Sequence, residues 1–270
     1  MSLFQPYRTI GFVSDALPYH LKRLGTENFI TVSIGKAWQV FNVSWLGSDA
    51  LQVEKLRLAL IGPQRERRIR AIASVRDLTF TTCGTQIIVW KRMKEVTRLV
   101  GHTGKVYLLY IFGSNLLSVC EHQVMLIWQL DPAGEGPSRA PSAIVYTPYS
   151  SASADHVARI AFPARHTASA RITCLMHPHT YLNKVVVGFS TGELELWNIK
   201  TRQKIFAFAT DHAPLAKILC VVQSPAVDVA GIGLDDGRVV LYNLKFAKVV
   251  AVFRHSDSGG VSCLTFRTGT

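Results

Sequence analysis

Alternating apolar and polar residues recur along the chain, and five such runs close on an aromatic residue. They are SIGKAWQVFNV (33–43), TTCGTQIIVWKR (81–92), CEHQVMLIWQL (120–130), FSTGELELWNI (189–199) and GLDDGRVVLYNL (233–244). Alternation over four to eight residues is typical of a strand with one buried and one exposed face. No 11-residue window shows helical periodicity bounded by caps. The pattern therefore predicts an all-β fold.

The closing aromatic residues define a repeat. They are Phe41, Trp90, Trp128, Trp197 and Tyr242, separated by 49, 38, 69 and 45 residues. Apart from the longest, these intervals suit a WD-type propeller blade of about 40–45 residues. Each unit is expected to hold four short strands, which in the unit of Trp197 fall near 171–176, 183–189, 193–199 and 203–209.

Two neighbouring units can be superposed residue by residue. With Trp197 placed on Tyr242, Gly188 falls on Gly233 and Gly192 on Gly237. Three cysteines take one common position in successive units: Cys174, Cys220 and Cys263. A repeat unit cannot bury its apolar faces alone, so the units are expected to pack against one another.

We therefore predict an incomplete WD-repeat β-propeller of about four full blades plus the first strand of a fifth. The expected unit boundaries are 1–60, 61–101, 102–165, 166–210 and 211–254, with another unit starting at 255–270.

Residues 131–170 are rich in Pro, Ser, Ala and Gly, which predicts a flexible insertion. Within it, residues 156–162 are the expected fourth strand of the third unit. A tolerated surface insertion is favoured over a partner-binding loop. An unpaired blade face is expected to make the isolated chain aggregate or unfold with weak cooperativity.

Composition narrows the class of protein. Hydrophobic residues make up 48% and charged residues 18% of 270 residues, an ordinary globular balance. No run of about 18 apolar residues predicts a membrane span, and no secretory signal is visible, so we expect an intracellular protein. Five scattered cysteines favour small buried side chains over a disulfide framework or zinc site.

Basic residues are concentrated in the first part of the chain. Residues 1–105 carry 16 Lys/Arg and 7 Asp/Glu, a net of +9, whereas residues 106–270 carry 14 and 11, a net of +3. Such an excess favours a polyanionic neighbour such as RNA. The candidate RNA or partner contacts are Arg65, Arg67, Arg68, Arg70, Lys91, Arg92 and Lys94. A solvated loop is favoured over a phosphate-contacting or nuclear-targeting patch, because no aromatic stacking platform is interleaved with the run.

The stretch Gly188–Gly192 matches G-x-S-x-G, the nucleophile elbow of serine hydrolases. An elbow joins a strand to a helix, but here a second alternating run follows at once. The repeat also puts Asp235, Glu121 and Cys83 where Ser190 stands. Ser190 is therefore predicted to be a turn residue, and the hydrolase hypothesis predicts fluorophosphonate labelling that we do not expect.

Two further motifs lack the surroundings that a dinucleotide site or a zinc site would need. Gly231–Gly237 has the spacing G-x-G-x-x-x-G and precedes a strand, so it lacks the helix N-terminus that holds a pyrophosphate. Cys174, His177 and His179 supply only three ligands of the four that a zinc site usually needs. We expect no enzyme activity, cofactor, metal or small-molecule substrate.

Histidines recur before the blades. Gly101-His102 precedes Trp128 by the spacing of a WD repeat, and Asp211-His212 leads similarly toward Tyr242. Such a histidine is expected to tie the loop before strand one to the turn before strand three, where only Asp236 is a suitable acid. The predicted structural positions are Phe41, Trp90, His102, Trp128, Trp197, His212, Asp236 and Tyr242.

Several longer phrases carry a family resemblance: YRTIGFVSDALPY (7–19), HPHTYLNKVVVGFSTGELELWNIKT (177–201), SPAVDVAGIGLDDGRVVLYNLKF (224–246) and GGVSCLTFRTG (259–269). Through these segments the chain resembles the U-three small-nucleolar-RNA-associated protein twenty-one family. Members of this family are WD-repeat subunits of the UTP-B subcomplex of the small-subunit processome. The resemblance implies part of the first of two tandem propellers and no catalytic residues. It also implies a scaffold in the nucleus and nucleolus that acts in small-subunit rRNA processing and ribosome biogenesis. The implied partners are other UTP-B subunits and processome proteins, with pre-rRNA or small nucleolar RNA nearby. The alternative is a WD-repeat adaptor in ubiquitin ligation or trafficking.

Overall fold

The computed structural model describes residues 18–44, 55–130, 146–148, 158–161, 170–208, 216–254 and 259–266. All helices and strands assigned within these ranges are strands, with no helix among them, and the strands form five sheets. The chain divides into two compact units, one made of residues 1–122 with 128–147, the other of residues 123–127 with 148–270. The predicted all-β fold is therefore confirmed.

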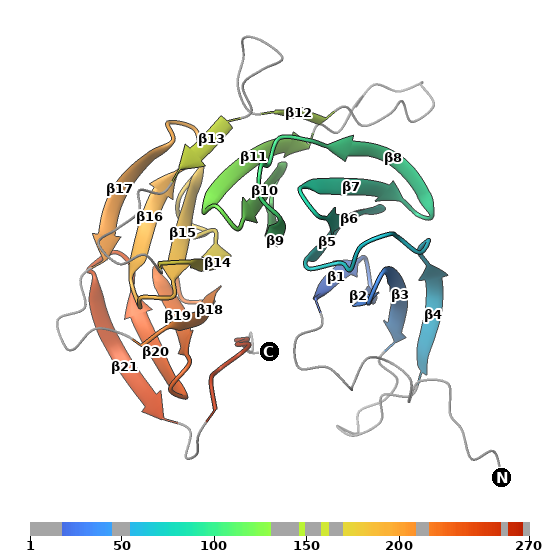
Figure 1. Ribbon diagram of the computed structural model, residues 1–270. Helices are drawn as coiled ribbons and strands as arrows, with labels where there is room; N and C mark the ends of the chain where they lie inside the picture. The colour runs from blue at the N-terminus through green and yellow to red at the C-terminus, as the bar shows by residue number, and fades with distance from the viewer. Residues whose placement is uncertain are drawn as a thin grey trace, which may run out of the picture. The chain divides into compact units, whose positions relative to one another are not determined.

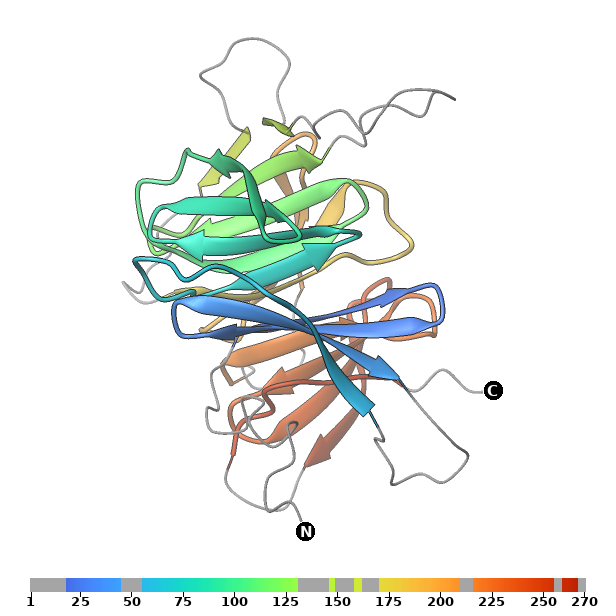
Figure 2. The same ribbon diagram turned by 90° about the vertical axis from the view of Figure 1, so that its right-hand side faces the viewer.

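Two complete four-stranded sheets lie in the first unit. One runs in the order β1 (Tyr19–Leu24), β2 (Glu27–Ile34), β3 (Ala37–Ser44) and β4 (Lys55–Ile61), and its twist is visible in Figure 2. The other runs in the order β5 (Ile72–Val75), β6 (Leu78–Cys83), β7 (Gln86–Lys91) and β8 (Lys94–Leu99) (Figure 1). Strands that follow one another in sequence are also neighbours in the sheet, which is the arrangement of a propeller blade.

The third sheet has five strands. It contains β9 (Val106–Phe112), β10 (Asn115–Cys120), β11 (Val124–Leu130), β12 (Tyr146–Pro148) and β13 (Ala158–Ala161). Both β12 and β13 pair with β11, and β13 does so over residues 124–127. The fourth strand expected at 156–162 is thus confirmed over 158–161. The other parts of the predicted insertion, residues 131–145, 149–157 and 162–169, lie outside the described residues.

Two more four-stranded sheets lie in the second unit. Their strands are β14 (Ile172–Met176), β15 (Lys184–Phe189), β16 (Leu194–Asn198) and β17 (Gln203–Phe208), then β18 (Ile218–Gln223), β19 (Val229–Leu234), β20 (Arg238–Asn243) and β21 (Lys248–Arg254). The prediction of about four full blades was therefore wrong by one. Residues 19–61 already build a complete sheet, so the run that closes on Phe41 belongs to a full blade.

The closing aromatic residues mark an irregularity that sequence spacing does not reveal. Where the third strand pairs with the fourth, the pairing shifts beside Phe41, Trp90, Trp197 and Tyr242 in four sheets. All four side chains are buried. A bulge adds an unpaired residue and increases local twist, so each aromatic side chain is buried beside a local distortion of its sheet.

Glycines in the second unit let a cysteine and a side chain of the next repeat approach the sheet. A Cβ atom on Gly188 would lie 2.6 Å from Cys174 Sγ and 3.1 Å from Ile218 Cγ2. The same contacts recur one blade later among Gly233, Cys220 and Val261. Burial raises the pKa of the Cys174 thiol to about 12, in keeping with a small packed side chain. The repeat of cysteine and glycine therefore reflects packing.

Candidate nucleic-acid interface

The linker between β4 and β5 carries the basic run and is held in place from two sides. The backbone N–H of Ile69 donates to Gly35 O at 2.9 Å, and that of Arg70 donates to Thr82 Oγ1 at 2.9 Å. Ile69 is only 1% exposed, whereas its neighbours Arg68 and Arg70 are exposed. Burial of one apolar side chain therefore fixes the position of the two flanking arginines.

Cationic side chains gather around the turn between β6 and β7. An open hollow of about 500 Å³ is lined by Arg67, Arg68, Arg70, Gly84 and Lys105. All four cationic residues are exposed. Gly84 has φ +64°, and a Cβ atom there would lie 2.7 Å from Arg67 Nη1. Glycine at this turn thus allows the Arg67 guanidinium to lie directly against the backbone.

Lys105 enters the hollow because the chain before β9 is joined to the same turn. The backbone N–H of Val106 donates to Gly84 O at 2.9 Å. The carbonyl of Lys105 accepts from the backbone N–H of Glu121 at 3.0 Å. These bonds bring a residue 21 positions beyond Gly84 to the edge of the hollow, so sequence proximity alone could not identify Lys105 as a site residue.

The position of Lys105 is basic in three sheets. In each, the residue before the first strand is exposed, and its carbonyl accepts from the turn between the second and third strands. The acceptor–donor pairs are Lys105–Glu121, Arg171–Ser190 and Lys217–Asp235, at 3.0, 2.8 and 3.0 Å. This position in the repeat therefore presents a cation repeatedly, a pattern that comparison of the turns and aromatic residues missed.

One carboxylate reaches the hollow. Arg70 forms an ion pair with Glu121, and about half of each side chain is exposed. Ion pairs between exposed side chains contribute only about 0–1 kcal/mol to stability. Exchange of Glu121 for another anion on Arg70 would therefore cost little.

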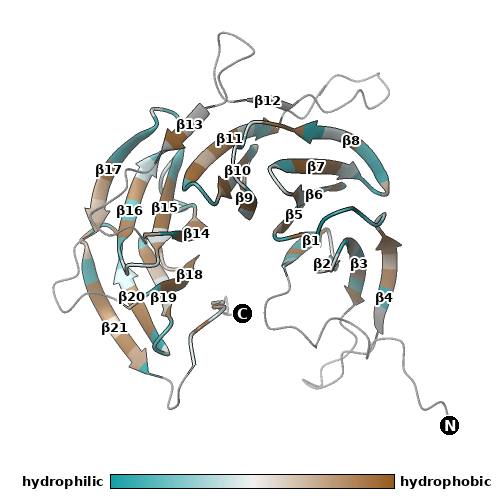
Figure 3. Cartoon of the chain, viewed as in Figure 1, coloured by the Kyte–Doolittle hydropathy of each residue, from teal (hydrophilic) through white to brown (hydrophobic). Residues whose placement is uncertain are grey.

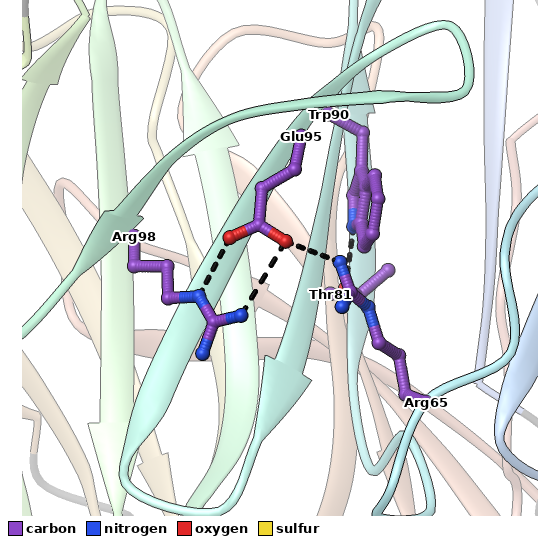
Figure 4. Close-up of polar contacts among 5 residues, drawn as sticks. All are labelled: Arg65, Thr81, Trp90, Glu95 and Arg98. Carbon is purple, nitrogen blue, oxygen red and sulfur yellow. Dashed lines mark hydrogen bonds and ion pairs between the residues drawn. The ribbon is translucent and has the colours of Figure 1, made fainter.

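Arg65 is used inside the second sheet and does not line the hollow. Figure 4 shows its guanidinium against Trp90, with Cζ 4.0 Å from the ring centroid, and its Nη2 donating to Glu95 Oε2 at 2.5 Å. Arg98 Nε donates to the other oxygen of Glu95 at 2.6 Å. Trp90 Nε1 in turn donates to Thr81 Oγ1 at 2.8 Å. Arg65 thus braces β7 and β8, and its side chain is only 19% exposed.

The charge of Glu95 is held by its two arginines. The hydrogen bond from Arg98 is the largest influence and lowers the pKa of this carboxyl, whereas burial, the next largest, raises it. The hydrogen bond from Arg65 and the charges of both arginines lower it further, so the pKa lies below its usual value. Glu95 therefore remains ionised at neutral pH, and the arrangement of Arg65 over Trp90 persists there.

The remaining predicted contacts lie at the opposite end of β7. Lys91 is its last residue, and Arg92 has φ +55° in the turn to β8, which begins at Lys94. Lys91 pairs with Asp77 at 3.3 Å. At about 3.3 Å per residue, the six-residue β7 separates the two ends by about 16 Å. The structure therefore brings together Arg67, Arg68 and Arg70 and places Lys91, Arg92 and Lys94 elsewhere.

Tryptophan and histidine side chains converge on one hydroxyl in the third sheet. Ser118 Oγ accepts from Trp128 Nε1 at 2.8 Å and lies 2.7 Å from His102 Nε2. His102 therefore bonds to the second strand, β10, and not to the turn before the third strand as predicted. That turn is reached by Thr103 instead, whose Oγ1 lies 3.1 Å from His122 Nδ1. The histidine expected to be structural is thus buried in a hydrogen-bond network.

The corresponding positions differ in the second unit. Trp197 Nε1 donates to Glu195 Oε2 at 2.8 Å, so a buried carboxylate replaces the hydroxyl of the earlier sheets. Asp236 accepts from the backbone N–H of Arg238 at 3.1 Å and from its Nε at 2.6 Å. His212 lies outside the described residues.

Ser190 occupies a turn between strands. Its Oγ accepts from the backbone N–H of Arg171 at 2.9 Å, Gly192 has φ +84°, and β16 follows. The predicted strand–turn–strand context is therefore confirmed. Among the described residues, His, Cys, Asp and Glu form no group of three suited to a metal ion. The same residues include no helix able to cross a bilayer.

Comparison with known proteins points to one family of WD-repeat proteins. Residues 30–270 match the family model described as WDR36/Utp21 first beta-propeller. The U3 small nucleolar RNA-associated protein 21 homolog of Schizosaccharomyces pombe is 28% identical over 98% of the chain, and WD repeat-containing protein 36 of Homo sapiens is 26% identical over 99%. U3 small nucleolar RNA-associated protein 21 of Saccharomyces cerevisiae is 24% identical over 98%. The chain spans 25–26% of the length of these relatives. Because the match covers residues 30–270 and the sheets have the order of propeller blades, the chain belongs to the WDR36/Utp21 first β-propeller family.

Proposed function

We propose that the chain is a non-catalytic scaffold that acts in processing of small-subunit rRNA. The observation that carries this proposal is similarity over 98% of the chain to a protein named for its association with U3 small nucleolar RNA. Its partners are other UTP-B subunits and processome proteins, with pre-rRNA or small nucleolar RNA nearby. It acts in the nucleus and nucleolus.

A scaffold role is consistent with the surface of the described blades. The residue before the first strand is an exposed cation in three sheets, and the G-x-S-x-G stretch forms a turn between strands. Neither feature implies a catalytic role. Both suit a protein that binds other macromolecules through the turns and loops of its blades.

Affinity purification tests the assignment. The tagged chain is recovered from the cells that express it, and U3 RNA and processome proteins are quantified against an unrelated tagged WD-repeat protein. We expect enrichment of both. Recovery of ubiquitin-ligase or trafficking subunits without processome components would instead support the adaptor hypothesis and contradict the proposal.

A labelling experiment tests the absence of hydrolase chemistry. The chain and its Ser190→Ala variant are exposed to a fluorophosphonate probe, with a known serine hydrolase as positive control. We expect neither form to be labelled, because Ser190 Oγ lies in a turn and accepts a backbone hydrogen bond. Labelling that disappears in the variant would contradict the proposal.

A further inference from the structure

We propose that the hollow formed by Arg67, Arg68, Arg70 and Lys105 binds backbone phosphates of single-stranded RNA. The inference rests on the proposed function for its RNA-rich setting and adds the site and its mode of recognition. Four exposed cations surround this one open hollow of about 500 Å³. Arginine guanidinium groups donate two parallel hydrogen bonds to a phosphate, and the charge is permanent at neutral pH.

The composition of the hollow favours phosphates over bases. Base recognition by single-strand binders relies on aromatic stacking, and the lining residues of this hollow contain no aromatic ring. Trp90 and Trp38, whose ring centroids lie 6.1 Å apart, are both buried, and Arg65 covers Trp90. Binding is therefore expected to depend on salt and to be insensitive to nucleotide sequence.

The same composition disfavours a protein partner. Protein interfaces usually contain a central apolar or aromatic anchor in a desolvated pocket. Here the lining residues are four cations and one glycine. A flexible polyanion satisfies such a surface without an apolar anchor.

The backbone holds the hollow ready before a ligand arrives. Ile69 fixes Arg68 and Arg70, Gly84 gives room to Arg67, and the Val106–Gly84 hydrogen bond holds Lys105 nearby. The carboxylate of Glu121 lies on Arg70 in the free protein. A phosphate takes its place on Arg70, so Glu121 acts as a weak internal competitor.

The test compares two charge-matched double variants of the full chain. One combines Arg67→Gln with Arg68→Gln in the hollow; the control combines Lys91→Gln with Lys94→Gln at the other end of β7. Both remove two positive charges from the same blade region, where Arg67, Arg68 and Lys94 are exposed and Lys91 is half-buried. Binding of a fluorescent 20-nucleotide oligouridylate is measured by anisotropy over a range of salt concentrations.

We expect the hollow variant to lose about tenfold in affinity at low salt and the slope of log K against log salt to fall by about 1.4, or about 0.7 for each lost phosphate contact. The control is expected to keep the affinity and slope of the parent chain. Glu121→Gln is expected to bind more tightly than the parent. Equal losses in both double variants, no loss in either, or preferred binding of a phosphoserine peptide over RNA would overturn the proposal.

Failure of this site and failure of the proposed function give different results. If only the site is wrong, the tagged parent chain still recovers processome proteins and U3 RNA, while the two double variants bind oligouridylate alike. If only the proposed function is wrong, the processome is not recovered, while the difference between the double variants persists. Circular dichroism of all variants confirms that each retains the β-sheet fold of the parent.

Discussion

The two ends of the sheet β5–β8 differ in how they hold their positive charge. At one end, a buried isoleucine, a glycine turn and backbone hydrogen bonds bring four cations to one hollow. At the other, Lys91 pairs with Asp77, and Arg92 lies in a hairpin turn. Figure 3 shows a largely hydrophobic β7 joining the two ends, next to a more hydrophilic β8. A hollow of about 520 Å³ at this other end is lined by Lys22, Arg76 and Arg92, but also by Asp77 and by aromatic and aliphatic side chains. The two ends therefore differ in composition, because cations and one glycine alone line the first hollow.

The largest expected loss of stability comes from truncating Ile69, the buried side chain that holds the linker beside the hollow. Ile69→Ala removes a side chain that is 1% exposed and should lower the free energy of unfolding by about 2–5 kcal/mol. Ile61→Ala is the matched control, because Ile61 is 51% exposed and its truncation should cost at most about 0.5 kcal/mol. Denaturant unfolding of the full chain measures both. Equal destabilisation would show that Ile69 does not anchor the linker.

A second loss of stability is expected at Trp90, the residue on which Arg65 stacks instead of lining the hollow. Trp90→Phe removes the donor to Thr81 Oγ1 and leaves that buried hydroxyl without this partner, at a cost of about 1–3 kcal/mol. The double variant with Thr81→Val should be less destabilised than the sum of the two single variants. Additive losses in a denaturation cycle would argue against a coupled pair.

Glycine substitutions separate stability from binding. Gly84→Ala and Gly113→Ala both place alanine at positive φ, +64° and +53°, and each should cost about 1–2 kcal/mol. Only at Gly84 does the new methyl group meet the Arg67 guanidinium, whereas Gly113 has no atom within 4 Å of that position. Oligouridylate affinity should therefore fall in Gly84→Ala alone. Parallel losses of affinity would mean that the placement of Arg67 is unimportant.

The smallest effect is pH-dependent. Glu95→Gln should cost less than about 1 kcal/mol at neutral pH, because the carboxylate is partly exposed to solvent. The folded-state pKa of Glu95 lies below the ordinary value of 4.5. Its stabilisation is therefore complete above pH 4.5 and disappears as the pH falls through the lower folded value. Unfolding curves of parent and variant should converge in acid, and a constant difference would exclude the ion pairs as the cause.

Strand-level features could be predicted from the sequence because they depend on local alternation and on repeated turns. The aromatic spacing located the third strands, and superposition of Trp197 on Tyr242 identified Ser190 as a turn residue. The bulges beside the aromatic residues could not be predicted, because they depend on the pairing of two strands. The number of full blades was predicted one too low, because the run that closes on Phe41 does not by itself show that residues 19–61 build a complete four-stranded sheet.

The candidate site was only partly predictable for the same physical reason. Arg67, Arg68 and Arg70 lie close together in the chain, and the linker keeps them together. Arg65 leaves the group because it stacks on Trp90, a residue 25 positions later. Lys105 joins it through a backbone bond between Val106 and Gly84. Contacts between segments distant in sequence therefore decided which basic residues form the hollow.

The most direct measurement is an RNA–protein crosslinking map of the particle recovered with the full tagged chain. The RNA-binding proposal predicts crosslinks to peptides that contain Arg67, Arg68, Arg70 or Lys105, and their loss in the Arg67→Gln and Arg68→Gln double variant. Crosslinks confined to the peptides around Lys91 and Lys94, unchanged in that variant, would contradict it.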